Sequence, residues 1–369
     1  MKKERIEGKR FLGGVYISSN QIKELDFIRF IACFSVVMIH TLHRTIYGRE
    51  VWNQELNHML MVIQLSLMFA TPLFVLVSEM ITAHSTKNSI PKGFLWRKIK
   101  FIIVPYFIMS IIYAIDKTFS ASNINQGFFE IWRLYLIGQW HGYFVLIICQ
   151  MYLLHIFFVK YFYDSNPAIL LTYTGLLSMG YWLMFDLYVP NLPSSKYSWE
   201  ILFRIPFLGW LFYFTMAFYA GKNIDQFRSF IYRYRKYMYL NLFITFCMVH
   251  ILFHNGIIHM VSSARYDVVL YTAFIFIGLF LFSRYWIDTP YSIKLVCSCS
   301  YGIYLLHPLV QKYVAIYIYR FQLSTLWYIV SIQILGIGIP VCIVLLCHKY
   351  WWGKYLVGKV SVPLKYKNN

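Results

Sequence analysis

The stretch LDFIRFIACFSVVMIH, at positions 25–40, contains three side chains whose types and spacing could do chemistry. Asp26 and Arg29 are three residues apart, so a helix places them on one face, where their charges can neutralise each other. His40 follows Arg29 after about three helical turns, roughly 16 Å further along the axis. An imidazole gains and loses a proton near neutral pH, so His40 is a candidate acid–base catalyst. A structural anchor for Asp26 and Arg29, and a buried neutral histidine for His40, are the alternatives.

Two more histidines, from distant parts of the chain, are expected in the outer half of the membrane, like His40. His141, in GQWHGYF, precedes the apolar run 142–162, and His307, in YGIYLLHP, lies ten residues into the run 297–317. An ionisable side chain in an apolar span is a functional candidate, because removing it from water is costly. The sequence therefore provides three histidines that a membrane fold could bring together.

A second set of polar residues is expected toward the opposite side of the membrane. Glu79, in FVLVSEMI, lies a turn from the end of its apolar run, where it can pair with Arg29 or face water. Arg97 and Lys98 open the next run, and cations beside Arg29 would suit the phosphates of an entering cofactor. The bias of basic residues toward the cytoplasmic side of membrane proteins explains Arg97 and Lys98 equally well.

His250 and His254 have the i, i+4 spacing of metal ligands, and His259 follows them. No acidic or third ligand is evident beside them. We therefore expect no metal site and assign these histidines to the membrane interface.

The composition indicates that all these residues belong to a membrane protein. Of 369 residues, 59% are hydrophobic and 13% are charged, about half the charged fraction of a typical soluble domain. Intervals without Asp, Glu, Lys or Arg, such as Glu55 to Glu79 and Arg320 to Lys349, are long enough to cross about 30 Å of hydrocarbon. The predicted fold class is all-α, a polytopic membrane protein of about ten transmembrane helices. The expected spans are 27–46, 59–82, 99–116, 142–162, 168–188, 206–222, 237–254, 267–284, 297–317 and 325–348.

The distribution of basic residues predicts the orientation of these spans. With the N-terminus inside, 24 of the 34 Lys and Arg residues fall in cytoplasmic segments and nine in outer segments. Both termini are therefore expected to be cytoplasmic. The predicted organisation is an N-terminal tail over 1–24, a transmembrane domain over 25–348 and a basic tail over 349–369.

The formal net charge of +19 has the same explanation, since basic inner loops set topology and meet anionic lipids. We therefore expect the lipid bilayer, and no nucleic acid, as a partner. The first apolar run lacks a small-residue cleavage site and is expected to remain as a helix. The seven cysteines lie within or beside predicted spans, which favours packing roles over disulfides.

Several segments in a fixed order make the chain resemble the acyltransferase-3 family of integral membrane acyltransferases. Arg29, ten residues and His40 match the signature of the family's first helix, and the likeness covers nearly the whole chain. The other segments that carry it are PLFVLVSEMI, WRKIKFIIVPYF, QWHGYFVLIICQMYLL and SCSYGIYLLHPLV. Within the family, IGQWHGYFVLIICQ, GWLFYFTMAFYAGKN and IYLLHP are most similar to the intercellular adhesion branch, described as exporters of poly-β-1,6-N-acetylglucosamine. Residues 78–80 depart from the family, with Ser-Glu-Met in place of the common Ser-Gly-Phe.

The resemblance implies transfer of an acyl group, acetyl or succinyl, from cytoplasmic acyl-CoA to a hydroxyl of a cell-surface polysaccharide. The enzyme would lie in the cell membrane, use acyl-CoA as donor substrate and need no metal. His40 would take the hydroxyl proton or carry the acyl group transiently, and Arg29 would hold the donor with Arg97 and Lys98. The residues expected to contact the sugar are Trp140, His141, Tyr143, Tyr301 and His307. Asp26 and Glu79 would have structural or pairing roles.

The alternative function is an exporter of poly-β-1,6-N-acetylglucosamine, or a partner of its synthase. A polymer conduit needs a wide pore lined by many Asp, Glu, Asn or Gln residues, and the predicted spans contain few. The sequence therefore favours the enzyme, with a polysaccharide synthase as a further candidate partner.

Overall fold

A computed structural model describes residues 9–12, 15–18, 22–48, 54–86, 89–120, 127–188, 199, 203–285 and 289–360. These residues form a helical bundle, preceded by an antiparallel hairpin of β1 (Lys9–Leu12) and β2 (Val15–Ser18). The first helices are α1 (Glu24–Gly48), α2 (Gln54–Ser66), α3 (Ala70–Ser85), α4 (Phe94–Ser120), α5 (Phe128–Leu136), α6 (Tyr143–Tyr161) and α7 (Pro167–Leu187). The others are η1 (Phe207–Trp210), α9 (Leu211–Lys222), α10 (Ile224–Arg233), α11 (Arg235–His254), α12 (Tyr266–Ser283), α13 (Tyr291–Tyr319), α14 (Thr325–Cys347) and α15 (Gly353–Leu356).

Nine helical segments in the described part of the chain are long and apolar enough to cross a membrane. They confirm the all-α, polytopic prediction and correspond to nine of the ten expected spans. One of them consists of α2 and α3, because the chain turns between these helices at 67–69, where the N–H of Leu67 donates to Gln64 O at 3.1 Å. The remaining expected span, 206–222, corresponds to η1 and α9, and α9 has only 12 residues.

The short helix α9 returns the chain alongside α7. Near the start of α9, the hydroxyl of Ser178 on α7 donates to Leu208 O at 2.8 Å. Near its end, the hydroxyl of Tyr219 donates to Phe162 O, in the turn that precedes α7, at 2.7 Å. Nearly all of α9 is buried, and it packs closely against α3. This short helix therefore lies inside the bundle.

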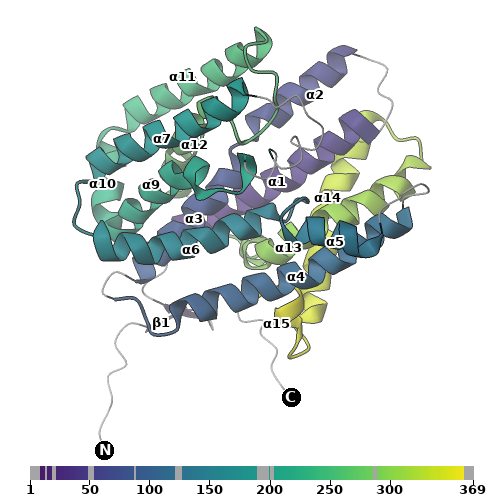
Figure 1. The fold of residues 1–369 in the computed structure, drawn as a ribbon, viewed down its shortest axis with the longest axis horizontal. Helices are drawn as coiled ribbons and strands as arrows, with labels where there is room; N and C mark the ends of the chain where they lie inside the picture. Colours follow the sequence, from purple (N-terminus) through teal and green to yellow (C-terminus); the bar gives the residue numbers. More distant parts are fainter. Residues whose placement is uncertain are drawn as a thin grey trace, which may run out of the picture.

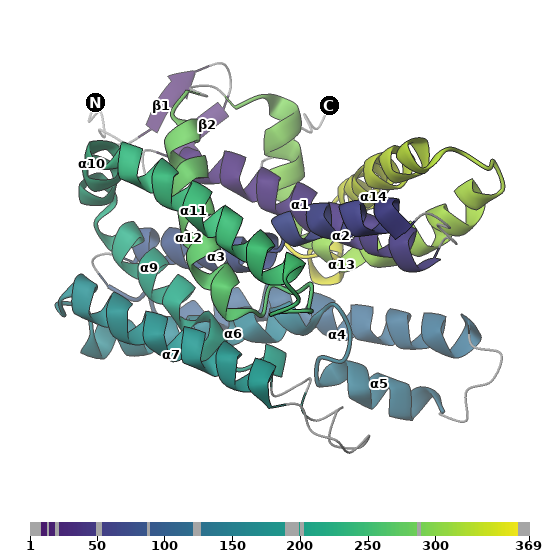
Figure 2. The same ribbon diagram turned by 90° about the horizontal axis from the view of Figure 1, so that it is seen from above.

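The helix α1 lies in the middle of the bundle, with α13 and α14 on one side and α9 to α12 on the other (Figures 1 and 2). Buried amides fix it to the neighbouring helices. Gln311 on α13 donates to Val37 O at 3.0 Å and to the Thr41 hydroxyl at 2.8 Å, and Gln333 on α14 donates to Phe34 O at 3.1 Å. Hydrogen bonds between helices stabilise membrane bundles, and here they fix the rotation of the helix that carries Arg29 and His40.

Contacts at the start of α1 gather several distant segments at one end of the bundle. Arg228 on α10 donates to both carboxylate oxygens of Glu24 at 2.9 Å, and the thiol of Cys297 on α13 donates to Asp26 O at 2.7 Å. The C-terminal α15 packs against α4, the helix that opens with Arg97 and Lys98. Connections that the charge distribution assigns to one side of the membrane therefore lie together.

Candidate active site

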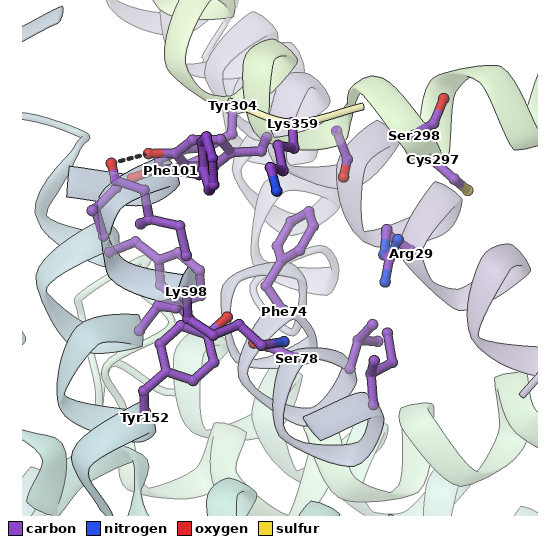
Figure 3. A pocket seen from close by; sticks show the side chains of 18 of the residues that line it. Arg29, Phe74, Ser78, Lys98, Phe101, Tyr152, Cys297, Ser298, Tyr304 and Lys359 are labelled. Atoms are coloured by element: carbon purple, nitrogen blue, oxygen red, sulfur yellow. Dashed lines mark hydrogen bonds between the residues drawn. The ribbon is translucent and has the colours of Figure 1, made fainter. Parts of the chain in front are cut away.

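A cavity of about 380 Å³ lies where α1 and α4 begin. Four basic side chains from distant segments line it: Arg29, Arg97, Lys98 and Lys359. Figure 3 shows Arg29, Lys98 and Lys359 around one space, with the ring of Phe74 among them. We call this space the Arg29 cavity.

Aromatic rings and a glycine position two of these cations. Lys98, in the first turns of α4, has its Nζ 5.5 Å from the ring centre of Tyr152. Lys359 has its Nζ 3.9 Å from the ring centre of Phe101, and it follows Gly358, whose φ of +81° favours glycine. A cation is attracted to the face of an aromatic ring, so both lysines are held at the cavity wall. Most of the other lining residues, from α3, α4, α6 and α13, are apolar or aromatic.

A second cavity, of about 480 Å³, lies further along α1 and includes His40. The segment 138–144 lines one side of it and contributes Trp140, His141 and Tyr143. Arg204 lines it as well, together with the segment 261–264. We call this space the His40 cavity.

The three histidines expected in the outer half of the membrane lie together in the structure. The ring centre of His40 is 5.0 Å from that of His307 and 6.3 Å from that of His141, and the last two are 5.8 Å apart. The Nδ1 of His307 lies 2.9 Å from Ile303 O. The carbonyl must accept this hydrogen bond, so Nδ1 carries the proton and Nε2 has a free lone pair. Burial lowers the pKa of His141 well below its usual range, and the neighbouring His40 lowers it further. This imidazole is therefore neutral at pH 7.

The two cavities meet at an aromatic wall, because Phe144 and Tyr304 line both of them. The rings of these two residues have centres 5.9 Å apart, and Phe74 lies 6.1 Å from Phe144. The hydroxyl of Tyr304 donates to the backbone oxygen of His141. The same two side chains therefore line both the basic cavity and the cavity that contains His40.

Other residues singled out from the sequence lie elsewhere. Tyr301, expected to contact a sugar, lines the Arg29 cavity, and its hydroxyl donates to Ile102 O at 2.6 Å. It lies three residues before Tyr304 on α13, so it is one turn nearer the Arg29 end.

The partner of Glu79 is also different from the one considered, Arg29. Its Oε1 lies 2.7 Å from His155 Nδ1, and His155 Nε2 lies 2.9 Å from the Thr86 hydroxyl, so the buried carboxyl joins α3 to α6. Asp26 and Arg29, although one turn apart, form none of the ion pairs found among the described residues.

The cavity residues that were not singled out from the sequence include Phe144, Arg204, Tyr304 and Lys359. Phe144 and Tyr304 belong to the segments QWHGYFVL and YGIYLLHP, so the neighbouring histidines were a usable signal. Lys359 had no local signal beyond its place in a basic tail.

No cluster of three or more His, Cys, Asp or Glu among the described residues has a geometry that could hold a metal ion. All seven cysteines are free thiols.

The family model described as an acyltransferase domain matches residues 22–347, which include both cavities except Lys359. The chain belongs to the acyltransferase-3 family. This confirms the resemblance seen in the sequence, and it means that the fold is that of a membrane protein family named for acyl transfer.

Individual relatives have two kinds of name. The chain is 33% identical over 292 residues, 78% of its own length and 80% of the relative's, to YfiQ of Bacillus subtilis strain 168, whose name classes it as a membrane-bound acyltransferase. It is 24% identical over 346 residues, 92% of its length and 97% of the relative's, to a Staphylococcus aureus protein. A Staphylococcus epidermidis protein is 24% identical over 350 residues, 93% and 96% of the two lengths. Both staphylococcal names class the protein as a poly-β-1,6-N-acetyl-D-glucosamine export protein. No solved structure matches the chain.

Proposed function

We propose that this protein transfers an acyl group, acetyl or succinyl, from cytoplasmic acyl-CoA to a hydroxyl group of a cell-surface polysaccharide, within the cell membrane. The observation that carries the proposal is the pair of cavities that meet at Phe144 and Tyr304, one basic and one containing histidines. Membership of an acyltransferase family supports the type of reaction.

The Arg29 cavity is suited to the donor. Its four basic side chains complement the phosphate groups of CoA, and guanidinium groups can bind such groups through two hydrogen bonds. The apolar walls suit the chain that ends in the thioester. A donor seated there would direct its acyl end toward the wall of Phe144 and Tyr304.

The His40 cavity is suited to a sugar. The rings of Trp140 and Tyr143 offer apolar surfaces for a pyranose, and hydroxyl groups of Ser262 and Ser263 line the same space. A sugar hydroxyl is a weak nucleophile near neutral pH and needs a base beside it.

His40 acts as that base. As the hydroxyl oxygen attacks the carbonyl carbon of the thioester, its proton moves to the ring of His40. The new carbon–oxygen bond forms, the carbon–sulfur bond breaks, and CoA leaves as a thiolate that takes the proton from the imidazolium. The products are the sugar ester and free CoA, and His40 returns to its neutral form.

The second candidate is an exporter of poly-β-1,6-N-acetylglucosamine or a partner of its synthase, which the names of the staphylococcal relatives favour. Two separate cavities of about 380 and 480 Å³, with an aromatic wall between them, suit two small reactants better than a polymer in transit.

A His40→Ala strain separates the two functions. We expect normal membrane abundance, because the substitution removes a costly polar group from a span. Surface polymer, measured with a lectin, should persist, while base-labile acetate or succinate per sugar should nearly disappear. The control is His254→Ala, an exposed residue at the end of α11 outside the lining of both cavities. Polymer retained inside the cell, with unchanged ester per secreted sugar, would favour the exporter.

A further inference from the structure

A tyrosine from α4 is inserted into the backbone of α13 beside His307. Pro308 lies inside α13, and proline lacks an N–H and crowds the carbonyl group four residues earlier. In a regular helix, the N–H of Leu309 donates to Leu305 O. Here the N–H of Leu309 donates to the hydroxyl of Tyr113 at 3.1 Å, and that hydroxyl donates to Leu305 O at 3.0 Å. The hydroxyl therefore bridges the donor and the acceptor of one helical turn.

The bridged turn carries His307 and fixes its ring. Nδ1 of His307 donates to Ile303 O, and its Nε2 is buried with no hydrogen-bond partner in the described structure. The ring of His40 is the nearest imidazole, with centres 5.0 Å apart. Arg44 on α1 holds the same turn from another side, since its Nη2 donates to Pro308 O at 2.7 Å. The unpaired Nε2 is thus an acceptor held close to His40.

The ring of Tyr113 also contacts the segment that carries the third histidine. Its centre is 4.8 Å from that of His141 and 4.8 Å from that of Trp140. Tyr113 therefore contacts the segments that carry two of the histidines. Its hydroxyl bonds to the turn of α13 that carries His307, and its ring packs against His141, which precedes α6.

We propose that Tyr113 is a positioning residue for acyl transfer, a role that rests on the proposed function. Its hydroxyl holds the bridged turn of α13 so that Nε2 of His307, which has no partner in the described structure, is placed to accept the N–H of His40 when the acceptor sugar binds. That hydrogen bond sets the tautomer of His40 and leaves the lone pair of its other ring nitrogen for the acceptor hydroxyl. Tyr113 contacts no reactant and acts through His307.

The first test compares two Tyr→Phe variants on α4 in proteoliposomes, with labelled acetyl-CoA and a β-1,6-linked N-acetylglucosamine oligosaccharide. Tyr106 is the matched control, because its ring also contacts Trp140, at 5.4 Å, while its hydroxyl donates to Tyr135 O, away from α13. Tyr113→Phe should lower kcat about tenfold to 10²-fold, since small misplacements of a catalytic group have effects of this size. Its KM for acetyl-CoA should stay within about twofold, because Tyr113 lies outside the Arg29 cavity. Tyr106→Phe should leave both constants within about twofold of wild type.

The second test is a double-mutant cycle with His307→Asn. If Tyr113 acts through His307, Tyr113→Phe should change kcat by less than about twofold in that background. A purely structural role predicts the same loss in both backgrounds, which would overturn the proposal, as would full activity of Tyr113→Phe. Failure of the wild-type protein to acylate any oligosaccharide would instead remove the proposed function, and the role of Tyr113 with it.

Discussion

The Arg29 cavity and the His40 cavity differ in the kind of charge that lines them. Four lysine and arginine side chains line the first, whereas Arg204 is the only such residue among the described residues that line the second. The second contains His40 and His141, with His307 behind them. Lysine and arginine side chains favour binding of an anion, and a neutral imidazole can accept a proton.

This difference indicates a division of labour along one helix. Arg29 and His40 are both on α1, yet they line different cavities, and among the described residues only Phe144 and Tyr304 line both. Changes on one side should therefore affect donor use, and changes on the other side should affect the chemical step.

The largest effect on donor binding is expected from Arg29. Arg29→Gln should raise the KM for acyl-CoA by about tenfold or more, because a hydrogen bond to a charged group is lost. Arg29→Lys keeps the charge but loses the two-point geometry, so its effect should be smaller and in the same direction. Steady-state kinetics with each substrate varied in turn should show a change in the KM for the donor and none for the acceptor. If the KM for the donor is unchanged in well-folded variants, Arg29 is a structural anchor and does not bind the donor.

Salt should distinguish ligand binding in the two cavities, by a smaller factor than the Arg29 substitutions do. Raising the ionic strength from 0.05 to 0.5 M should weaken donor binding several-fold, because ions screen the attraction between the phosphates and the cations that line the cavity. Binding of a neutral oligosaccharide should change little. Equilibrium binding of a non-hydrolysable acyl-CoA analogue and of the oligosaccharide, measured in the same membranes, tests this. Equal salt dependence of both ligands would argue against separate sites.

The smallest effect is expected at the shared wall. Tyr304→Phe keeps the ring that separates the cavities and removes one hydrogen bond, to the backbone oxygen of His141. A neutral hydrogen bond contributes about 1 kcal/mol, so kcat should fall about fivefold with little change in either KM. Transfer assays at saturating substrates measure this. A loss as large as that of His40→Ala would instead make Tyr304 part of the chemistry.

The spans could be predicted from the sequence because a lipid-embedded helix needs about 20 residues without charge. The break at 67–69 was not predicted, although Pro72 lacks the N–H that would bond to Met68 O and crowds that carbonyl group. The helix α5 lies between the expected spans 99–116 and 142–162, and β1 and β2 lie in a segment predicted as a tail. Short or amphipathic elements lack the long apolar signal on which the prediction depended.

Part of the site was predictable for a similar reason. Arg29 and His40 are linked by helical geometry alone, so their common face could be derived from spacing. The meeting of His40 with His141 and His307 depends on how three distant helices pack, which spacing does not determine. Lys359 reaches the Arg29 cavity only because α15 packs against α4.

The sidedness of transfer tests the central claim, that the two cavities take their reactants from opposite faces of the membrane. Inside-out and right-side-out vesicles of the same strain are loaded with the oligosaccharide and given labelled acyl-CoA, which does not cross the bilayer, from outside. We predict ester formation on the trapped oligosaccharide only in inside-out vesicles, where the cytoplasmic face is accessible to the donor, and none in vesicles with His40→Ala. Ester formation in right-side-out vesicles, or only when donor and acceptor share one face, would contradict this account.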